Sequence, residues 1–135
     1  MSSIEEVIAG LTATNHALAL DMATRLGKTA ITAGNRPGFV VNRILVPMIN
    51  EAILVFQEGL ASAEDIDAGM RLGCNQPIGP LALADLIGLD TLLAIMQAFH
   101  EGFNDSKYRP APLLKEMVAA GYLGRKTGRG FHAYA

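Results

Sequence analysis

The segment PGFVVNRILVPMINEAI, Pro37–Ile53, decides the fold, because it is apolar at nearly every position. The apolar character continues until Gly59, and we predict one long helix over Phe39–Glu58. A helix that is apolar on all faces is buried on all sides. In a chain of 135 residues it must therefore be the central helix, or be completed by a second subunit. Pro47 lies inside the helix and removes one backbone hydrogen bond, which predicts a kink.

Two polar residues, Asn42 and Arg43, interrupt this run near its start. A buried polar side chain without a hydrogen-bond partner costs roughly 1–3 kcal/mol. The pair is therefore either a structural tie or a functional site. For Arg43 we expect a structural salt bridge. The candidate partners are Glu51, Glu58 and Asp85.

The chain beyond position 34 carries helix signals throughout. In SAEDIDAGMRLG, Ser62 is a predicted N-cap with Asp65 three residues later, and Gly73 is the predicted end. The segment LALADLIGLDTLLAIMQAFHEGFN has apolar residues at helical spacing, with Gly88 as a break. LLKEMVAAG predicts a last helix ending at Gly121. These signals predict a mainly α fold, a bundle of about five helices.

The first 33 residues have a different pattern. Residues 4–9 and 29–33 predict two short strands, and the helical segment between them ends at Gly27. Two strands are too few for a stable sheet. We therefore predict two parts: a strand–helix–strand unit without its sheet over residues 1–33, and a helical domain over residues 34–135.

Composition and charge limit the function classes. Half of the residues are hydrophobic and the net charge is −2, so nothing favours a nucleic-acid partner or an anionic membrane surface. No apolar run reaches the ~20 residues of a membrane span. The single cysteine, Cys74, excludes an internal disulfide and is compatible with a reducing compartment. We expect a cytoplasmic domain.

Ligand-binding patterns are sparse. The three histidines and the cysteine show no paired spacing, so we expect no metal site, and we expect each histidine at the surface or at a packing edge. The C-terminal segment GYLGRKTGRGFHAYA has positive charges among four glycines and no acid. Its cations are Arg125, Lys126 and Arg129. This segment is either a solvated basic terminus or a contact for a phosphate or ribose.

Four segments occur in order over residues 35–134: NRPGFVVNRILVPMINEAI, EDIDAGMRLG, PIGPLALADLIGLD and GYLGRKTGRGFHAY. Together they resemble the C-terminal domain of the 3-hydroxyacyl-CoA dehydrogenases, closest to the bacterial 3-hydroxybutyryl-CoA type. The resemblance that they carry runs from about Glu6 to Tyr134. The resemblance implies a helical bundle similar to the C-terminal domains of 6-phosphogluconate dehydrogenase-like proteins. It also implies a domain that dimerises and completes the substrate cleft of a two-domain enzyme, which transfers hydride between an acyl-CoA and NAD.

Two residues match functional positions of this family. Asn42 matches the asparagine that reaches the active site and holds the reacting oxygen of the substrate. Lys126 matches a lysine that contacts NAD. Asp85 falls in a typical stretch of the family, but the resemblance assigns it no chemical role; it caps or pairs inside the bundle.

The family's other catalytic parts do not occur in this sequence. They are the GxGxxG turn, the stretch with the catalytic histidine and the glutamate that orients it. The resemblance therefore implies that a Rossmann domain, in cis or in trans, binds most of the NAD, and that this chain alone is inactive. Residues 1–33 would be the last strand–helix–strand unit of that domain. The alternative is a non-catalytic, stand-alone dimerisation module or a subunit of a split enzyme.

Overall fold

A computed structural model describes residues 15, 17–22, 25–27 and 40–135. The chain divides into two compact units, Met1–Gly34 and Asn35–Ala135. In the first unit, residues 17–22 are helical and Gly27 has a φ of +72°, as expected for a glycine that ends a helix. The two strands predicted over residues 4–9 and 29–33 lie outside the described residues.

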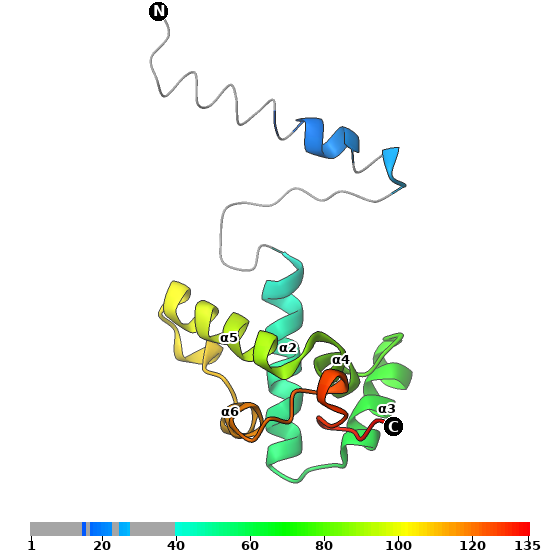
Figure 1. Cartoon of the computed structure of the whole chain (residues 1–135), viewed down its shortest axis with the longest axis vertical. Helices are drawn as coiled ribbons and strands as arrows, with labels where there is room; N and C mark the ends of the chain where they lie inside the picture. Colours follow the sequence, from blue (N-terminus) through cyan, green and yellow to red (C-terminus); the bar gives the residue numbers. More distant parts are fainter. Residues whose placement is uncertain (1–14, 16, 23–24, 28–39) are drawn as a thin grey trace, which may run out of the picture. The chain divides into compact units, whose positions relative to one another are not determined.

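The long helix α2, Val41–Gln57, is the central element of the second unit (Figure 1). It makes contact with each of the other four α-helices. These are α3 (Ala63–Cys74), α4 (Pro80–Ile87), α5 (Leu89–Phe103) and α6 (Pro112–Ala119). Val46, Ile49 and Ile53 follow helical spacing and are buried. The prediction of a central helix is confirmed.

Local signals set the ends of the surrounding helices. The backbone N–H of Asp65 donates to Ser62 Oγ at 3.1 Å, so the predicted N-cap of α3 is confirmed. The predicted end at Gly73 is wrong by one residue, because Asn75 adopts the left-handed conformation with φ of 55° and caps the helix. Gly88, with φ of +102°, separates α4 from α5, and the chain bends there by 98°.

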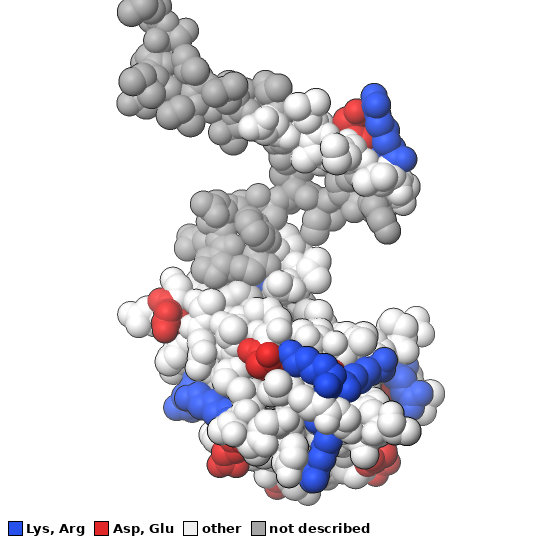
Figure 2. All heavy atoms as spheres, viewed as in Figure 1, with Lys and Arg blue, Asp and Glu red and all other residues white. Residues whose placement is uncertain are grey.

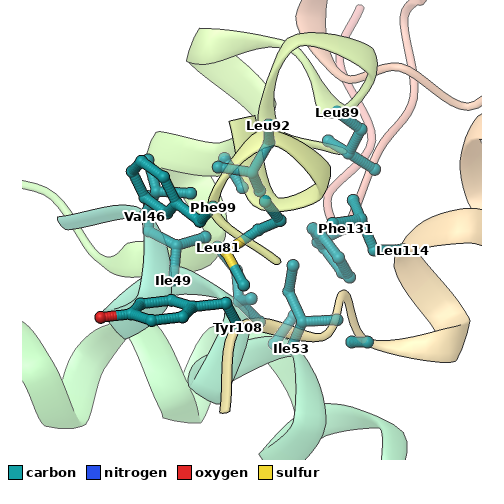
Figure 3. Close-up of a cluster of buried hydrophobic side chains, with 14 residues drawn as sticks. Val46, Ile49, Ile53, Leu81, Leu89, Leu92, Phe99, Tyr108, Leu114 and Phe131 are labelled. Atoms are coloured by element: carbon teal, nitrogen blue, oxygen red, sulfur yellow. The ribbon is translucent and has the colours of Figure 1, made fainter. Parts of the chain in front are cut away.

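The hydrophobic core lies where α2, α4, α5 and α6 meet the C-terminal segment (Figure 3). Phe131 comes from that segment and packs edge-on against Phe56 of α2, with ring centroids 5.7 Å apart. Phe99 of α5 packs against Tyr108 in the same way at 5.8 Å. The C-terminal segment is therefore part of the core and is not an appendage.

The second unit confirms the mainly α fold class. Over residues 40–135 it has five α-helices and two 3₁₀ turns, η1 (Ser106–Tyr108) and η2 (Arg125–Thr127). Backbone pairing of the β type within this range is limited to the isolated bridges Gly124–Arg129 and Arg129–Ala133. No single helix among the described residues is long and apolar enough to cross a membrane.

The buried amide of α2 is Asn50, and the inference from burial at Asn42 and Arg43 was wrong. Asn50 is 3% exposed; its Oδ1 accepts the N–H of Ala111 at 2.8 Å, and its Nδ2 donates to the carbonyl of Arg109 at 3.2 Å. Asn42 and Arg43 are exposed, because the first turns of α2 extend past the helices that cover its middle (Figure 1).

Arg43 has an aromatic partner in place of the predicted carboxylate. Its guanidinium lies 4.4 Å from the ring centroid of Phe103. Among residues 40–135 it forms none of the ion pairs expected with the three candidate acids. Burial raises the pKa of Tyr108, but Arg43 and Lys107 beside it lower that pKa by more. The Arg43 guanidinium therefore covers the ring of Phe103 at the end of α5, and its structural role stays a prediction.

We predict that Asn50→Ala lowers the free energy of unfolding by about 2 kcal/mol or more, because it leaves the N–H of Ala111 buried and unpaired. The control is Gln57→Ala. Gln57 also accepts an N–H at the start of α6, that of Leu113 at 2.9 Å, but in an exposed position. Its loss should cost less than about 1 kcal/mol. Urea unfolding of both variants tests this, and equal losses would contradict it.

Candidate functional site

Residues 121–135, here called the C-terminal strap, are held by one buried carboxylate. Asp85 of α4 is 1% exposed. It accepts the N–H groups of Phe131 at 2.9 Å and His132 at 3.0 Å, and the hydroxyl of Tyr134 at 2.7 Å. The expectation that Asp85 pairs inside the bundle is confirmed, and its partners are three groups of the strap.

Glycines let the strap approach α4 this closely. A Cβ atom at Gly130 would overlap the carboxylate of Asp85, and one at Gly124, where φ is +106°, would overlap the Asp85 backbone. A further backbone bond, from the N–H of Leu89 to the carbonyl of Leu123 at 3.0 Å, joins the strap to the start of α5. The strap is thus fixed against both α4 and α5.

A second buried carboxylate, Asp67 of α3, connects three parts of the fold. It accepts the N–H groups of Leu81 at 2.8 Å and Ala82 at 2.9 Å, and so caps α4. Its Oδ2 lies 2.7 Å from Nε2 of His132. Since a carboxylate only accepts, Nε2 carries the proton. Glu64 lies 3.6 Å from Nδ1 on the other side of the ring.

The sequence-based expectation for His132 missed this pair. His132 and Asp67 are 65 residues apart, and no local spacing indicates their contact. A cavity of about 420 Å³ opens beside the pair, with a mixed set of charges on its wall. Its charged lining residues are Glu64, Asp67, Arg71, Arg125 and His132. The described residues contain no group of three or more ligands placed to hold a metal ion.

Lys126, the residue predicted to contact a cofactor, belongs to η2, and its side chain lies beside the first turn of α5. Its Nζ is 2.6 Å and 2.8 Å from the two carboxylate oxygens of Asp90. The two side chains are about half exposed, at 49% and 43%. The Lys126 ammonium lowers the pKa of the Asp90 carboxyl. Lys126 is therefore held in place and still open to solvent.

The other two cations of the strap lie on aromatic rings. Arg125 is 5.5 Å from the ring centroid of Tyr134, and Arg129 is 4.3 Å from that of Tyr122. Figure 2 shows basic side chains gathered over the place that the orange-red strap occupies in Figure 1, with an acidic side chain against them. The strap is thus not the freely solvated basic terminus that the sequence left open.

Asn42 is placed elsewhere, in the first turn of α2. Its side chain is exposed, and no described residue forms a hydrogen bond with it. An apolar groove of about 410 Å³ runs beside this end of the helix, lined among others by Val41, Ile44 and Met48. Within the described part of the chain, Asn42 and Lys126 do not contact each other. Their functional roles stay predictions.

The strap's contact with Asp85 makes a prediction about pH. Burial and the Asp85 carboxylate raise the pKa of Tyr134 from 10.0 to about 12. Because the folded state raises this pKa, the hydroxyl's contribution to stability is complete below about pH 10 and is lost as the pH rises towards 12. Tyr134→Phe should therefore be less stable than the natural chain at pH 8, and the difference should narrow between pH 10 and 12.

Urea unfolding of both proteins at intervals from pH 8 to 12 tests this. Tyr122→Phe is the control, since the Tyr122 ring lies beneath Arg129 and its hydroxyl forms no hydrogen bond with any of residues 40–135. A stability difference for Tyr134→Phe that stays constant across this pH range would contradict the prediction.

Comparison with known proteins identifies the family of this chain. Residues 38–134 match the family described as 3-hydroxyacyl-CoA dehydrogenase, C-terminal domain. The (S)-3-hydroxybutyryl-CoA dehydrogenase of Ralstonia eutropha has a solved structure that is 66% identical, with a TM-score of 0.87 over 90% of this chain and 43% of that one. The chain is also similar to two curated proteins.

A probable 3-hydroxybutyryl-CoA dehydrogenase of Bacillus subtilis is 58% identical over 132 residues, which are 96% of this chain and 46% of the relative. The mitochondrial hydroxyacyl-coenzyme A dehydrogenase of Homo sapiens is 43% identical over 85% of this chain and 37% of its own length. The chain thus spans less than half the length of these relatives. Since the family match covers most of its residues, the chain belongs to the 3-hydroxyacyl-CoA dehydrogenase family and corresponds to its C-terminal domain.

Proposed function

We propose that this chain forms the C-terminal part of an NAD-dependent 3-hydroxybutyryl-CoA dehydrogenase of the cytoplasm. The observation that carries the proposal is 58–66% identity, over at least nine-tenths of the chain, to two proteins with that name. In this function the chain completes the substrate cleft. A Rossmann domain, in cis or in trans, binds most of the NAD, and hydride passes between NAD and C3 of the acyl-CoA.

In this proposal Asn42 holds the reacting oxygen on C3. Its amide can donate as well as accept a hydrogen bond, and no described residue forms a hydrogen bond with it. It lies in the first turn of a 17-residue helix that has no acidic residue in that turn. The N-terminus of such a helix favours negative charge, which develops on the oxygen when a ketone is reduced. Asn42 and the helix end would act on the same oxygen.

Lys126 contacts the cofactor in this proposal. Its ammonium is half exposed and fixed by Asp90, so it can donate to a phosphate or ribose oxygen of NAD brought up by the other domain. The strap that carries Lys126 is anchored to α4 through Asp85. The position of the ammonium therefore depends on the core of this domain.

The test joins this chain to the N-terminal part of the Ralstonia enzyme in place of that enzyme's own C-terminal part. We predict acetoacetyl-CoA-dependent oxidation of NADH by the joined protein. Asn42→Ala should lower kcat by about 10²-fold or more with little change in KM, because its amide acts on charge that develops in the transition state. Asn15→Ala, at an exposed helical asparagine of the first unit, is the control.

The chain by itself should show no oxidation, because the general base and the main cofactor site are missing, and loss of the base alone costs about 10²–10⁴-fold. Full activity of Asn42→Ala would contradict the role proposed for Asn42 at the reacting oxygen. A joined protein that folds and binds NADH but has no activity would favour the non-catalytic dimerisation module.

We also propose that a second copy of the chain covers an apolar face of α2 and α3. Two apolar grooves, of about 410 and 340 Å³, share Met48 and make this α2–α3 face continuous. Its other apolar residues include Val41, Ile44, Val55, Ile66 and Met70. Ile44 is 68% exposed, and Gly69 has open space above it, so another backbone can approach closely. Soluble monomers rarely expose large contiguous apolar patches.

Light scattering of the whole chain at micromolar concentration tests the dimer. We predict a mass of twice 14.3 kDa. Ile44→Asp should shift the chain towards the monomer, because it buries a charge in the apolar contact. Leu86→Asp, at an exposed residue of α4 that lines neither groove, is the control. A natural chain that remains at 14.3 kDa would refute the proposal.

A further inference from the structure

We infer that Asp90 is a positioning residue, which fixes Lys126 at the first turn of α5 so that the ammonium can meet the cofactor. The inference rests on the role proposed above for Lys126 and adds a residue to which no function has been given. Lys126 and Asp90 are 36 residues apart in sequence, and the fold brings them to 2.6 Å.

The backbone on both sides of the pair is fixed. Lys126 lies in η2, between Gly124 and Gly128, which both have positive φ. Asp90 is the second residue of α5, and the neighbouring Leu89 donates its N–H to the strap carbonyl of Leu123 at 3.0 Å. The ammonium and the carboxylate are therefore held by two elements that are already joined by a backbone bond.

Gly88 makes room for the pair. A Cβ atom at this position would lie 3.0 Å from Oδ1 of Asp90 and 3.1 Å from Nζ of Lys126. These distances are tighter than most side-chain contacts, and the φ of +102° also disfavours other residues. Gly88 thus both separates α4 from α5 and leaves the space in which the Lys126 ammonium lies.

Electrostatics explains why the ammonium needs Asp90. The N-terminus of a helix carries partial positive charge, and α5 has 15 residues and no side-chain cap. A lysine ammonium beside this end is repelled unless a carboxylate compensates. Without the charge of Asp90, the flexible chain of Lys126 would turn into solvent and sample many rotamers. When Asp90 is present, the Lys126 side chain loses its rotamer freedom when the domain folds, and binding of the cofactor does not have to order it.

The pair leaves capacity for a ligand. An ammonium has three N–H donors, and the two oxygens of Asp90 accept at most two of them in this geometry. At least one donor points away from Asp90, on a side chain that is 49% exposed. The remaining donor is suited to an oxygen of the cofactor, whether on a ribose or on a phosphate.

The experiment uses the joined enzyme described above, with Asp90→Asn, Asp90→Glu, Lys126→Ala and the double variant Asp90→Asn/Lys126→Ala. We expect Asp90→Asn to raise KM for NADH by about three- to fivefold and to leave kcat within about twofold. Asp90→Glu should restore part of the affinity. The double variant should match Lys126→Ala alone, because residues that act through each other are not additive. Fluorescence titration with NADH gives the same comparison without turnover.

Glu101→Gln is the matched control, since it removes one exposed negative charge from the same helix at a distance from Lys126. If Lys126→Ala raises KM for NADH but Asp90→Asn lowers only thermal stability, Asp90 is structural and the inference is overturned while the proposed function stands. If the effects of Asp90→Asn and Lys126→Ala on KM for NADH add up in the double variant, the inference is likewise overturned. If Lys126→Ala leaves KM and NADH affinity unchanged, the role of Lys126 and this inference both fail.

Discussion

The carboxylate of Asp85 is the interaction on which the rest of the second unit depends. A buried carboxylate is tolerated only when its oxygens are bonded, and here three groups of the strap satisfy them. This requirement folds residues 121–135 back onto α4. It places Phe131 in the core against Phe56 and carries Lys126 to the first turn of α5. The hydrophobic core and the candidate cofactor contact are thus ordered by one side chain.

Two further buried polar residues act in the same way at other joints. Asn50 joins the middle of α2 to the loop before α6, and Asp67 joins α3 to the start of α4 and to His132. Apolar packing among leucine, isoleucine and phenylalanine side chains drives collapse but has little direction. The hydrogen bonds of these three residues define which segments meet, since any other arrangement leaves a buried polar group unpaired.

Two exposed features of the domain underlie the functional proposals. The first turns of α2 present Asn42 to solvent, and the apolar α2–α3 face continues from there along both helices. Neither the exposed Asn42 nor the apolar α2–α3 face belongs to the buried core of the domain. The relatives that contain the matching domain are more than twice as long as this chain. This length is compatible with the proposal that another domain or a second copy covers these surfaces. The functional proposals therefore concern what these surfaces meet.

The sequence by itself determined the helices, because their signals are local: the apolar run of α2, the Ser62 cap and the glycine break at Gly88. It also determined the family and the positions of its candidate residues, through four ordered motifs. Only the tertiary structure decided that Asn50 is buried while Asn42 is exposed, since both lie on the same apolar helix. The pairs of Lys126 with Asp90 and of His132 with Asp67 span 36 and 65 residues. No local pattern encodes such contacts, because they arise only when separate helices pack and the last residues fold onto a buried carboxylate.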